Sequence, residues 1–263
     1  MRLLLFVAAV VGVGRAAAAE PPFPESDVDR PLLMYSGMTS LDVGLDLPTY
    51  VHFDANGNAT TSNTAIGRYV NADVVLSHSF GNVEVGARIL GDPSGPYAQA
   101  RALAYLGPIP GALLMTAQIK APSSDSVADH EYTEGVGYTY KLAIMPHQLA
   151  LLADVNLSIS ELGLKSIAMS PPAPPAGTYV YGGAGFAAEV QVTAPFAIAV
   201  GGGVTGAIRQ PPELGSGSAS LAAEMSLLYA LDRWDFYCQL GLSDIAGSRR
   251  PSVNFGVVHR WGG

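Results

Sequence analysis

Large apolar residues recur at every second position over most of the chain. In the segment from Leu41 to Leu47, each odd position is large and apolar and each even position is small or acidic. Because a period of two places successive side chains on opposite faces of a strand, the segment predicts a strand with one apolar and one polar face. Segments of this kind predict 12 strands, at 38–47, 66–80, 82–90, 97–106, 111–121, 131–144, 148–159, 178–193, 196–208, 218–231, 234–243 and 252–261.

The connections between these segments alternate in length. Long connections, such as 48–65, 122–130 and 160–177, alternate with short ones, such as 145–147 and 194–195. A soluble sandwich has no reason to place every long loop at one end, whereas outer-membrane barrels have short periplasmic turns and longer external loops. We therefore expect an all-β fold, an up-and-down antiparallel transmembrane β-barrel of about 12 strands with both termini in the periplasm.

Aromatic residues follow the same assignment. Phe80, Phe196, Trp234 and Trp261 fall at the expected periplasmic ends of their strands. An aromatic girdle lies at this interface in membrane barrels. The alternative is chance clustering beside turns.

The first residues have the features of an export signal. Arg2 supplies a positive charge, Leu3 to Gly14 are apolar, and Ala17 to Ala19 offer a small-residue cleavage site. We expect a signal peptide at 1–19, a periplasmic N-terminal segment at 20–37 and the barrel at 38–263. The expected location is the outer membrane, with its lipids and lipopolysaccharide as partners.

Charge and cysteine content narrow the function. The chain has 14 basic and 22 acidic residues, a formal net charge of -8, which argues against a nucleic-acid partner. A single cysteine, Cys238, excludes a disulfide scaffold and a cysteine-based zinc site.

The last strand resembles the signal by which bacterial outer-membrane proteins are recognised for assembly. Val253, Phe255 and Val257 alternate toward the aromatic Trp261. His259 occupies a usually apolar position, and two glycines follow Trp261. The resemblance implies the barrel-assembly machinery as a partner.

A further resemblance rests on two stretches. The first runs from Ser77 through Phe80-Gly81-Asn82 to Gly86, and the second ends a strand at Ile119-Lys120-Ala121-Pro122 before an expected external loop. They resemble the phenol meta-pathway (MetA-type) outer-membrane transporter family, although Ser123 replaces the family's glycine after Pro122. The resemblance implies passage of small hydrophobic or aromatic compounds across the outer membrane.

Enzymatic and metal chemistry are not expected. Outer-membrane phospholipases place a histidine and a serine two residues apart on one face, but His78 and Ser79 are adjacent and predicted to point to opposite faces. The run from Asp54 to Thr60 starts like a calcium loop, but its glycine is at the fourth position instead of the sixth. We expect no catalytic residue, metal or cofactor. Divalent ions bridging the acidic 125–131 loop to lipopolysaccharide remain the alternative to a solvated loop.

Charged residues occupy the face opposite the large apolar residues, where they would line the lumen. Eight acids and five bases leave an excess of three negative charges. The predicted pore-lining residues are Asp42, Asp46, Asp73, Glu84, Arg88, Arg101, Lys120, Lys141, Asp154, Glu189, Glu224, Asp235 and Arg260.

Three tyrosines are predicted to form a solute-binding mouth at the external end. Tyr69, Tyr97 and Tyr179 are in phase with inward charges rather than with the lipid-facing residues. A tyrosine ring can stack on an apolar solute while its hydroxyl stays in water. The alternative is an external girdle in which a bulge has shifted the phase.

Two functions follow from this interpretation. The first is a channel or facilitator for passive passage of small solutes, with hydrophobic or aromatic ones as the class that the resemblance implies. The second is a structural or surface-binding barrel whose lumen is closed by salt bridges or by the 20–37 segment. Twelve strands lie between the filled small barrels and the open large ones.

Overall fold

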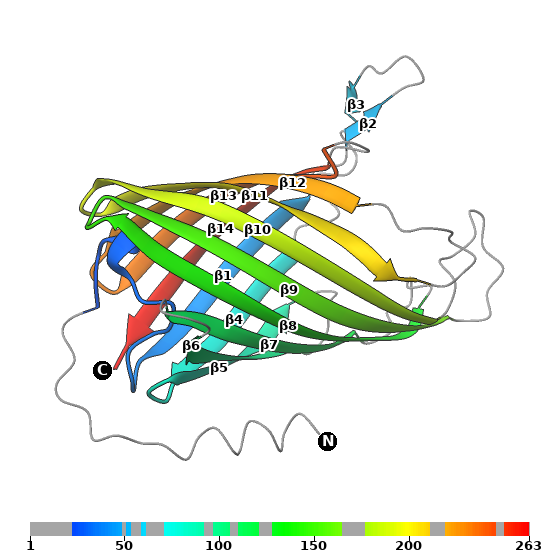
Figure 1. Ribbon diagram of the computed structural model, residues 1–263, viewed down its shortest axis with the longest axis horizontal. Coiled ribbons are helices and arrows are strands. Elements are labelled where there is room, and N and C mark those ends of the chain that lie inside the picture. The colour runs from blue at the N-terminus through cyan, green and yellow to red at the C-terminus, as the bar shows by residue number, and fades with distance from the viewer. Residues whose placement is uncertain are drawn as a thin grey trace.

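The computed structural model describes residues 23–48, 51–53, 59–61, 71–91, 97–105, 110–120, 128–164, 177–210, 219–245 and 250–262. Twelve antiparallel strands form a closed barrel in which each strand pairs with its neighbours in the chain (Figure 1). The first and last strands close the barrel, with Thr39 opposite Trp261 and Leu47 opposite Val253. The predicted up-and-down barrel and its strand number are therefore confirmed. The barrel strands are β1 (Thr39–Pro48), β4 (Asn71–Ser79), β5 (Val83–Gly91), β6 (Tyr97–Tyr105), β7 (Pro110–Lys120), β8 (Ala128–Met145), β9 (Leu149–Leu164), β10 (Gly177–Thr193), β11 (Phe196–Arg209), β12 (Ala219–Leu231), β13 (Trp234–Ser243) and β14 (Arg250–Trp261).

The outer surface of the barrel is apolar. Phe186 is 69% exposed and Ile208 is 68% exposed, whereas Asp235, on the inward face of its strand, is 1% exposed. This arrangement inverts that of a water-soluble domain, and it fits strands that alternate apolar residues toward lipid with polar residues toward the lumen. The barrel is therefore a transmembrane one. No helix within the described ranges is long and apolar enough to cross a membrane.

Two strands extend beyond their predicted limits. β8 begins at Ala128 and β9 ends at Leu164, so pairing continues into the segments expected to be loops. Polar pairs such as Tyr132 opposite Glu161 belong to this extension. Backbone hydrogen bonds hold strands together regardless of hydropathy, so a pattern of apolar alternation underestimates strands that leave the membrane.

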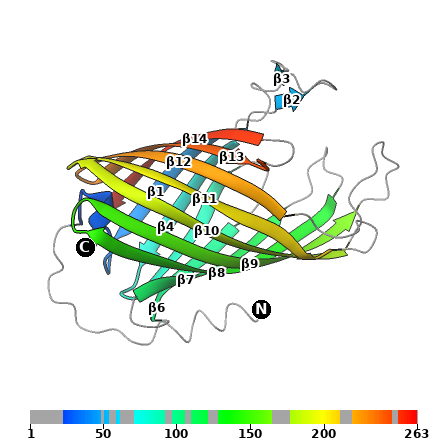
Figure 2. The ribbon, with the colours of Figure 1, turned by 45° about the horizontal axis from the view of Figure 1, so that its top comes forward.

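The connection expected at 48–65 contains a small hairpin that the sequence pattern did not indicate. β2 (Val51–Phe53) pairs with β3 (Ala59–Thr61), separately from the barrel. Figure 2 shows this hairpin away from the barrel wall, at the end opposite the C-terminus. Its strands have three residues each, too few for a period to be recognised.

Candidate functional site

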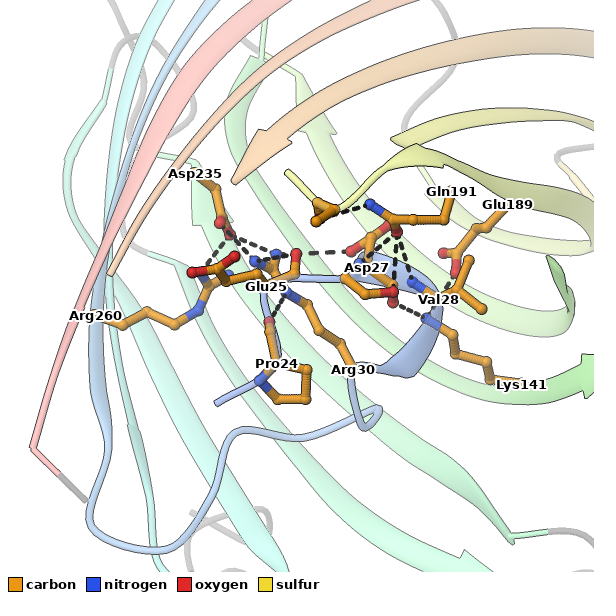
Figure 3. A network of polar contacts seen from close by, with 12 residues as sticks. Pro24, Glu25, Asp27, Val28, Arg30, Lys141, Glu189, Gln191, Asp235 and Arg260 are labelled. Carbon is orange, nitrogen blue, oxygen red and sulfur yellow. Dashed lines mark hydrogen bonds and ion pairs between the residues drawn. The ribbon is translucent and has the colours of Figure 1, made fainter. Parts of the chain in front are cut away.

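Residues 23–38, which we call the plug segment, lie inside the end of the barrel that carries the short turns (Figures 1 and 3). The segment forms one turn of 3-10 helix, η1 (Asp27–Asp29), and then runs to the start of β1. Side chains from β4, β5, β8, β10, β13 and β14 reach it. The functional question is how firmly it narrows the lumen.

An ion-pair cluster ties the plug segment to the last two strands. Arg30 donates two hydrogen bonds to Asp235, each 2.7 Å long, and Arg260 donates to the same carboxylate. Arg30 also donates from Nε to the Pro24 carbonyl, which holds the guanidinium in place. The Phe23 ring lies 5.3 Å from the Arg30 guanidinium and 5.0 Å from that of Arg260. Arg30 Nη1 also lies 3.7 Å from Asp27 Oδ1, so two carboxylates balance the two guanidiniums of this cluster.

A glutamine from β10 binds the start of η1. Gln191 Oε1 accepts hydrogen bonds from Asp27 N at 2.9 Å and from the Ser26 hydroxyl at 3.1 Å. Its Nε2 donates to the carbonyls of Thr193 and Ala194 in the turn that follows. The first N–H groups of a helical turn have no partner within the turn, so a barrel side chain supplies what a capping residue would.

Lys141 connects β8 to the same turn. Its Nζ donates to the Asp27 carbonyl at 2.7 Å and lies 2.6 Å from a Glu189 carboxylate oxygen. Glu189 is buried, so its ion pair with Lys141 also offsets the cost of removing a carboxylate from water. Lys141 thus links the barrel wall to the plug segment through a charge and a backbone group.

The barrel edge with the short turns carries one more contact. His147, in the turn between β8 and β9, lies with Nδ1 2.6 Å from an Asp29 carboxylate oxygen. Burial acts to raise the Asp29 pKa, but hydrogen bonds with His147 and Ser26 and the charge of His147 outweigh it, so the pKa is lowered. The His147 side chain is 80% exposed, which makes this contact the most accessible to solvent of those described above.

The second half of the plug segment binds β4 and β5. Met34 N donates to Glu84 Oε2 at 3.1 Å, and the Ser79 hydroxyl donates to the Met34 carbonyl at 2.8 Å. Gly37 N then donates to the Ser79 carbonyl, and Ser79 N donates to that of Met38. Both Glu84 and Ser79 are buried. The segment is therefore fixed at both ends.

The plug segment contributes several of the larger buried apolar side chains. Val28, Leu33, Met34 and Met38 are each less than 9% exposed. The larger apolar side chains of the barrel wall mostly face outward. Without the plug segment this end of the lumen would present mainly charged and small side chains to water.

A cavity of about 520 Å³ lies against the plug segment in the lumen. Basic side chains from β5, β6, β8 and β14 and carboxylates from β1, β5 and β10 reach it, together with apolar residues of the plug segment. A second cavity of about 330 Å³ lies between β12, β13 and β14. There Gln239 donates to Glu224 at 2.9 Å. The lumen thus retains space on the external side of the plug segment.

The predicted lumenal residues occupy the following places. The larger cavity is lined by Asp42, Glu84, Arg88, Arg101, Lys141, Glu189 and Arg260, and the smaller one by Glu224. Asp73 forms an ion pair with Arg88, and Asp235 forms one with Arg30. Asp154, on β9, is half-buried. The side chains of Asp46 and Lys120 lie outside the described residues, although both positions belong to strands. The structure brings most of the charged set together at the plug end.

The predicted tyrosine mouth is described only in part. Tyr179 is buried and stacks on Tyr181, with 6.2 Å between ring centroids and 4° between ring planes. Tyr69 and the side chain of Tyr97 lie outside the described residues. Tyr181 adds a second ring to the one predicted at this strand.

The structure keeps His78 and Ser79 apart. His78 Nδ1 lies 2.8 Å from the Thr39 hydroxyl, and its ring contacts Phe80. The Ser79 hydroxyl instead donates to the plug segment. The two side chains therefore have different partners on the two faces of β4. Within the described ranges no group of His, Cys, Asp and Glu side chains could hold a metal ion; of the calcium-like run 54–60, residues 54–58 lie outside those ranges.

Several residues of this site were missed from the sequence. Arg30, Gln191 and His147 bind across the lumen, and their partners are more than 100 positions away. Arg30 is the sole basic residue between positions 20 and 37, which is a signal that could have been noticed. Tyr237 was also missed: it donates to Asp42 at 3.0 Å, and its ring lies over Gly256.

No family model matches the sequence, and no curated protein matches it. Solved structures do match. An outer-membrane channel from Pseudomonas putida F1 is 15% identical, with 87% of this chain and 97% of that chain covered and a TM-score of 0.53. The translocator domain of the autotransporter NalP from Neisseria meningitidis is 12% identical, with 99% and 94% covered and a TM-score of 0.49. At these identities the first likeness shows the barrel fold, and it fits the resemblance to outer-membrane transporters seen in the sequence.

Proposed function

We propose that the protein is a passive channel of the bacterial outer membrane for small solutes, narrowed at its periplasmic end by the plug segment. The observation that carries this proposal is the cavity of about 520 Å³ in the lumen, lined by charged side chains from the barrel wall. Charged groups inside a barrel face water or pair with each other, because lipid exposure near the bilayer centre costs about 2 to 4 kcal/mol for Arg or Lys. Water in this cavity gives a solute a route down to the plug segment.

The plug segment is the point of highest resistance along this route. Ion pairs and hydrogen bonds connect this segment to the barrel wall, and water can also solvate the groups that form them. Such contacts have a modest net free energy, since the released groups regain hydrogen bonds to water. Displacing the segment would expose little apolar surface of the barrel wall, but it would expose the buried apolar side chains Val28, Leu33, Met34 and Met38 of the segment itself.

Planar-bilayer conductance of the purified full-length protein tests the channel. We expect small discrete current steps whose reversal potential depends on lumenal charge. Glu224→Gln should move the ion preference away from cations, because Glu224 is exposed to the lumen. Phe186→Leu, on the lipid-facing surface, is the matched control and should leave the reversal potential unchanged.

The second candidate is a closed barrel that acts through its external loops. The ring of contacts from six strands around the plug segment favours it. If correctly folded protein gives no current steps, the closed barrel becomes the better account.

A further inference from the structure

Among the residues that the structure describes, one basic side chain in the larger cavity has no carboxylate partner. Arg30 and Arg260 share Asp235, Arg88 pairs with Asp73, and Lys141 pairs with Glu189. Arg101, on β6, has no ion pair with any of the residues that the structure describes. Its guanidinium is half-buried, and it lines the cavity.

The plug segment explains why Arg101 is unpaired. Glu84 stands directly opposite Arg101 in the β5–β6 register, the position from which a cross-strand ion pair would be expected. The Glu84 carboxylate instead accepts a hydrogen bond from Met34 N. The plug segment therefore engages Glu84, the residue expected to pair with Arg101.

The plug segment contributes apolar side chains to the cavity, beside Asp27 and Arg30. Pro31, Leu32 and Leu33 line it there, and Val75 lines it on β4. A guanidinium beside apolar side chains matches a ligand that has a carboxylate at one end and an apolar body at the other. Guanidinium presents paired N–H donors that fit a carboxylate bidentately.

We propose that the cavity between the plug segment and β6 binds a small monocarboxylate with an apolar body, with Arg101 on its carboxylate. This inference rests on the proposed channel function and gives its solute a chemical class. The cavity of about 520 Å³ exceeds the volume of a single-ring acid, so a solute of this class fits with its water. Neutral solutes of the same shape gain the apolar contacts without the charge-assisted hydrogen bonds.

Calorimetric titration of the purified full-length barrel with benzoate tests the site. We expect benzoate to bind at least tenfold more tightly than benzyl alcohol, since hydrogen bonds to a charged group are the stronger kind. Arg101→Gln should weaken benzoate binding about 10-fold to 100-fold and leave the binding of benzyl alcohol unchanged. Arg209→Gln, on the exposed end of β11, is the matched control and should change neither.

A second variant tests the role assigned to Glu84. Glu84→Gln keeps an oxygen that accepts the Met34 N–H and removes the negative charge beside Arg101. Benzoate binding should strengthen several-fold, the opposite direction from Arg101→Gln. A general loss of folding would weaken binding in both variants, so the opposed directions separate the site from a stability effect.

The outcomes distinguish this site from the channel. Current steps from a protein that binds benzoate no better than benzyl alcohol would overturn the carboxylate site and leave the channel standing. Benzoate binding that depends on Arg101 in a protein without conductance would overturn the channel and leave the site. Unchanged benzoate affinity in Arg101→Gln would also overturn the site.

Discussion

Arg30 and Asp235 lie 205 positions apart and form a two-pronged ion pair inside the barrel, with both nitrogen–oxygen distances at 2.7 Å. Asp235 is 1% exposed and also accepts from Arg260. Removing one partner of a buried pair typically costs about 3 to 5 kcal/mol, because the other charge is left without compensation. The contact is therefore the strongest single tie between the plug segment and the wall.

Asp235→Ala should release the plug segment and raise the single-channel conductance. The substitution leaves two guanidiniums close together, whereas Arg30→Ala leaves Asp235 with Arg260. We therefore expect the larger increase in Asp235→Ala. Bilayer recordings measure the conductance, and protease sensitivity of the N-terminal segment reports its release. Equal conductance in both variants and the wild type would show that the plug segment does not limit flow.

The contact between Asp29 and His147 predicts a pH dependence of plug docking. The Asp29 pKa is lowered from 3.8 in the docked state, because hydrogen bonds and the charge of His147 outweigh the effect of burial. A lowered pKa contributes stability above the ordinary value, and this stability is lost as pH falls through the docked value. Protease sensitivity of the plug segment should therefore rise below about pH 3.8.

The variant Asp29→Asn provides the control for this pH dependence. Asp29→Asn removes the ionisable group, so this part of the pH dependence should disappear. A variant that keeps the wild-type dependence would assign it to other carboxylates of the lumen.

Gly256→Ala should destabilise the barrel near the plug segment. A Cβ atom at Gly256 would overlap Tyr237 Cζ, so the ring must move and its hydrogen bond to Asp42 is lost. Overpacking of this kind costs about 1 to 3 kcal/mol. Gly137→Ala is the control, because its nearest contact would be 3.4 Å. Urea unfolding followed by gel mobility should show a lower midpoint for Gly256→Ala alone.

The stacked tyrosines near the start of β10 predict a preference for aromatic solutes. Tyr179→Ala combined with Tyr181→Ala should lower uptake of an aromatic solute more than uptake of a sugar of equal size. The reason is that only the aromatic solute loses its stacking on the tyrosine rings. Liposome uptake of the two solutes measures the ratio. Equal losses for both would indicate destabilisation of the barrel and end the case for aromatic selectivity.

Trp261 is predicted to act in assembly. It ends β14 and lies 5.5 Å from His259 between ring centroids, on the outward face near Trp234. Trp261→Ala should lower the amount of barrel in the outer membrane while the exported protein still accumulates in the periplasm. Fractionation and immunoblotting measure both amounts. Wild-type levels in the outer membrane would remove the assembly role.

The fold could be predicted because each strand carries its own signal. Alternation of large apolar with small or charged residues fixes which face of β1, β10 or β13 meets lipid, as Phe186 and Asp235 show by their exposure. Short connections force antiparallel neighbours, so the strand order follows from the chain order. The closure of the barrel and its apolar outer surface could therefore be inferred without knowing any contact between distant residues.

The lumen could be predicted only as a list of inward charges. The same alternation identifies Glu84, Arg101 and Asp235 as inward, but it does not say which charges meet across a barrel. Those pairings depend on the strand register and on the path of residues 23–38, which carry no period. The sequence by itself therefore determined a charged lumen. Only the tertiary structure decided that Arg30 pairs with Asp235, and that Met34 N donates to the Glu84 carboxylate that stands opposite Arg101. Both contacts form where segments distant in the sequence meet.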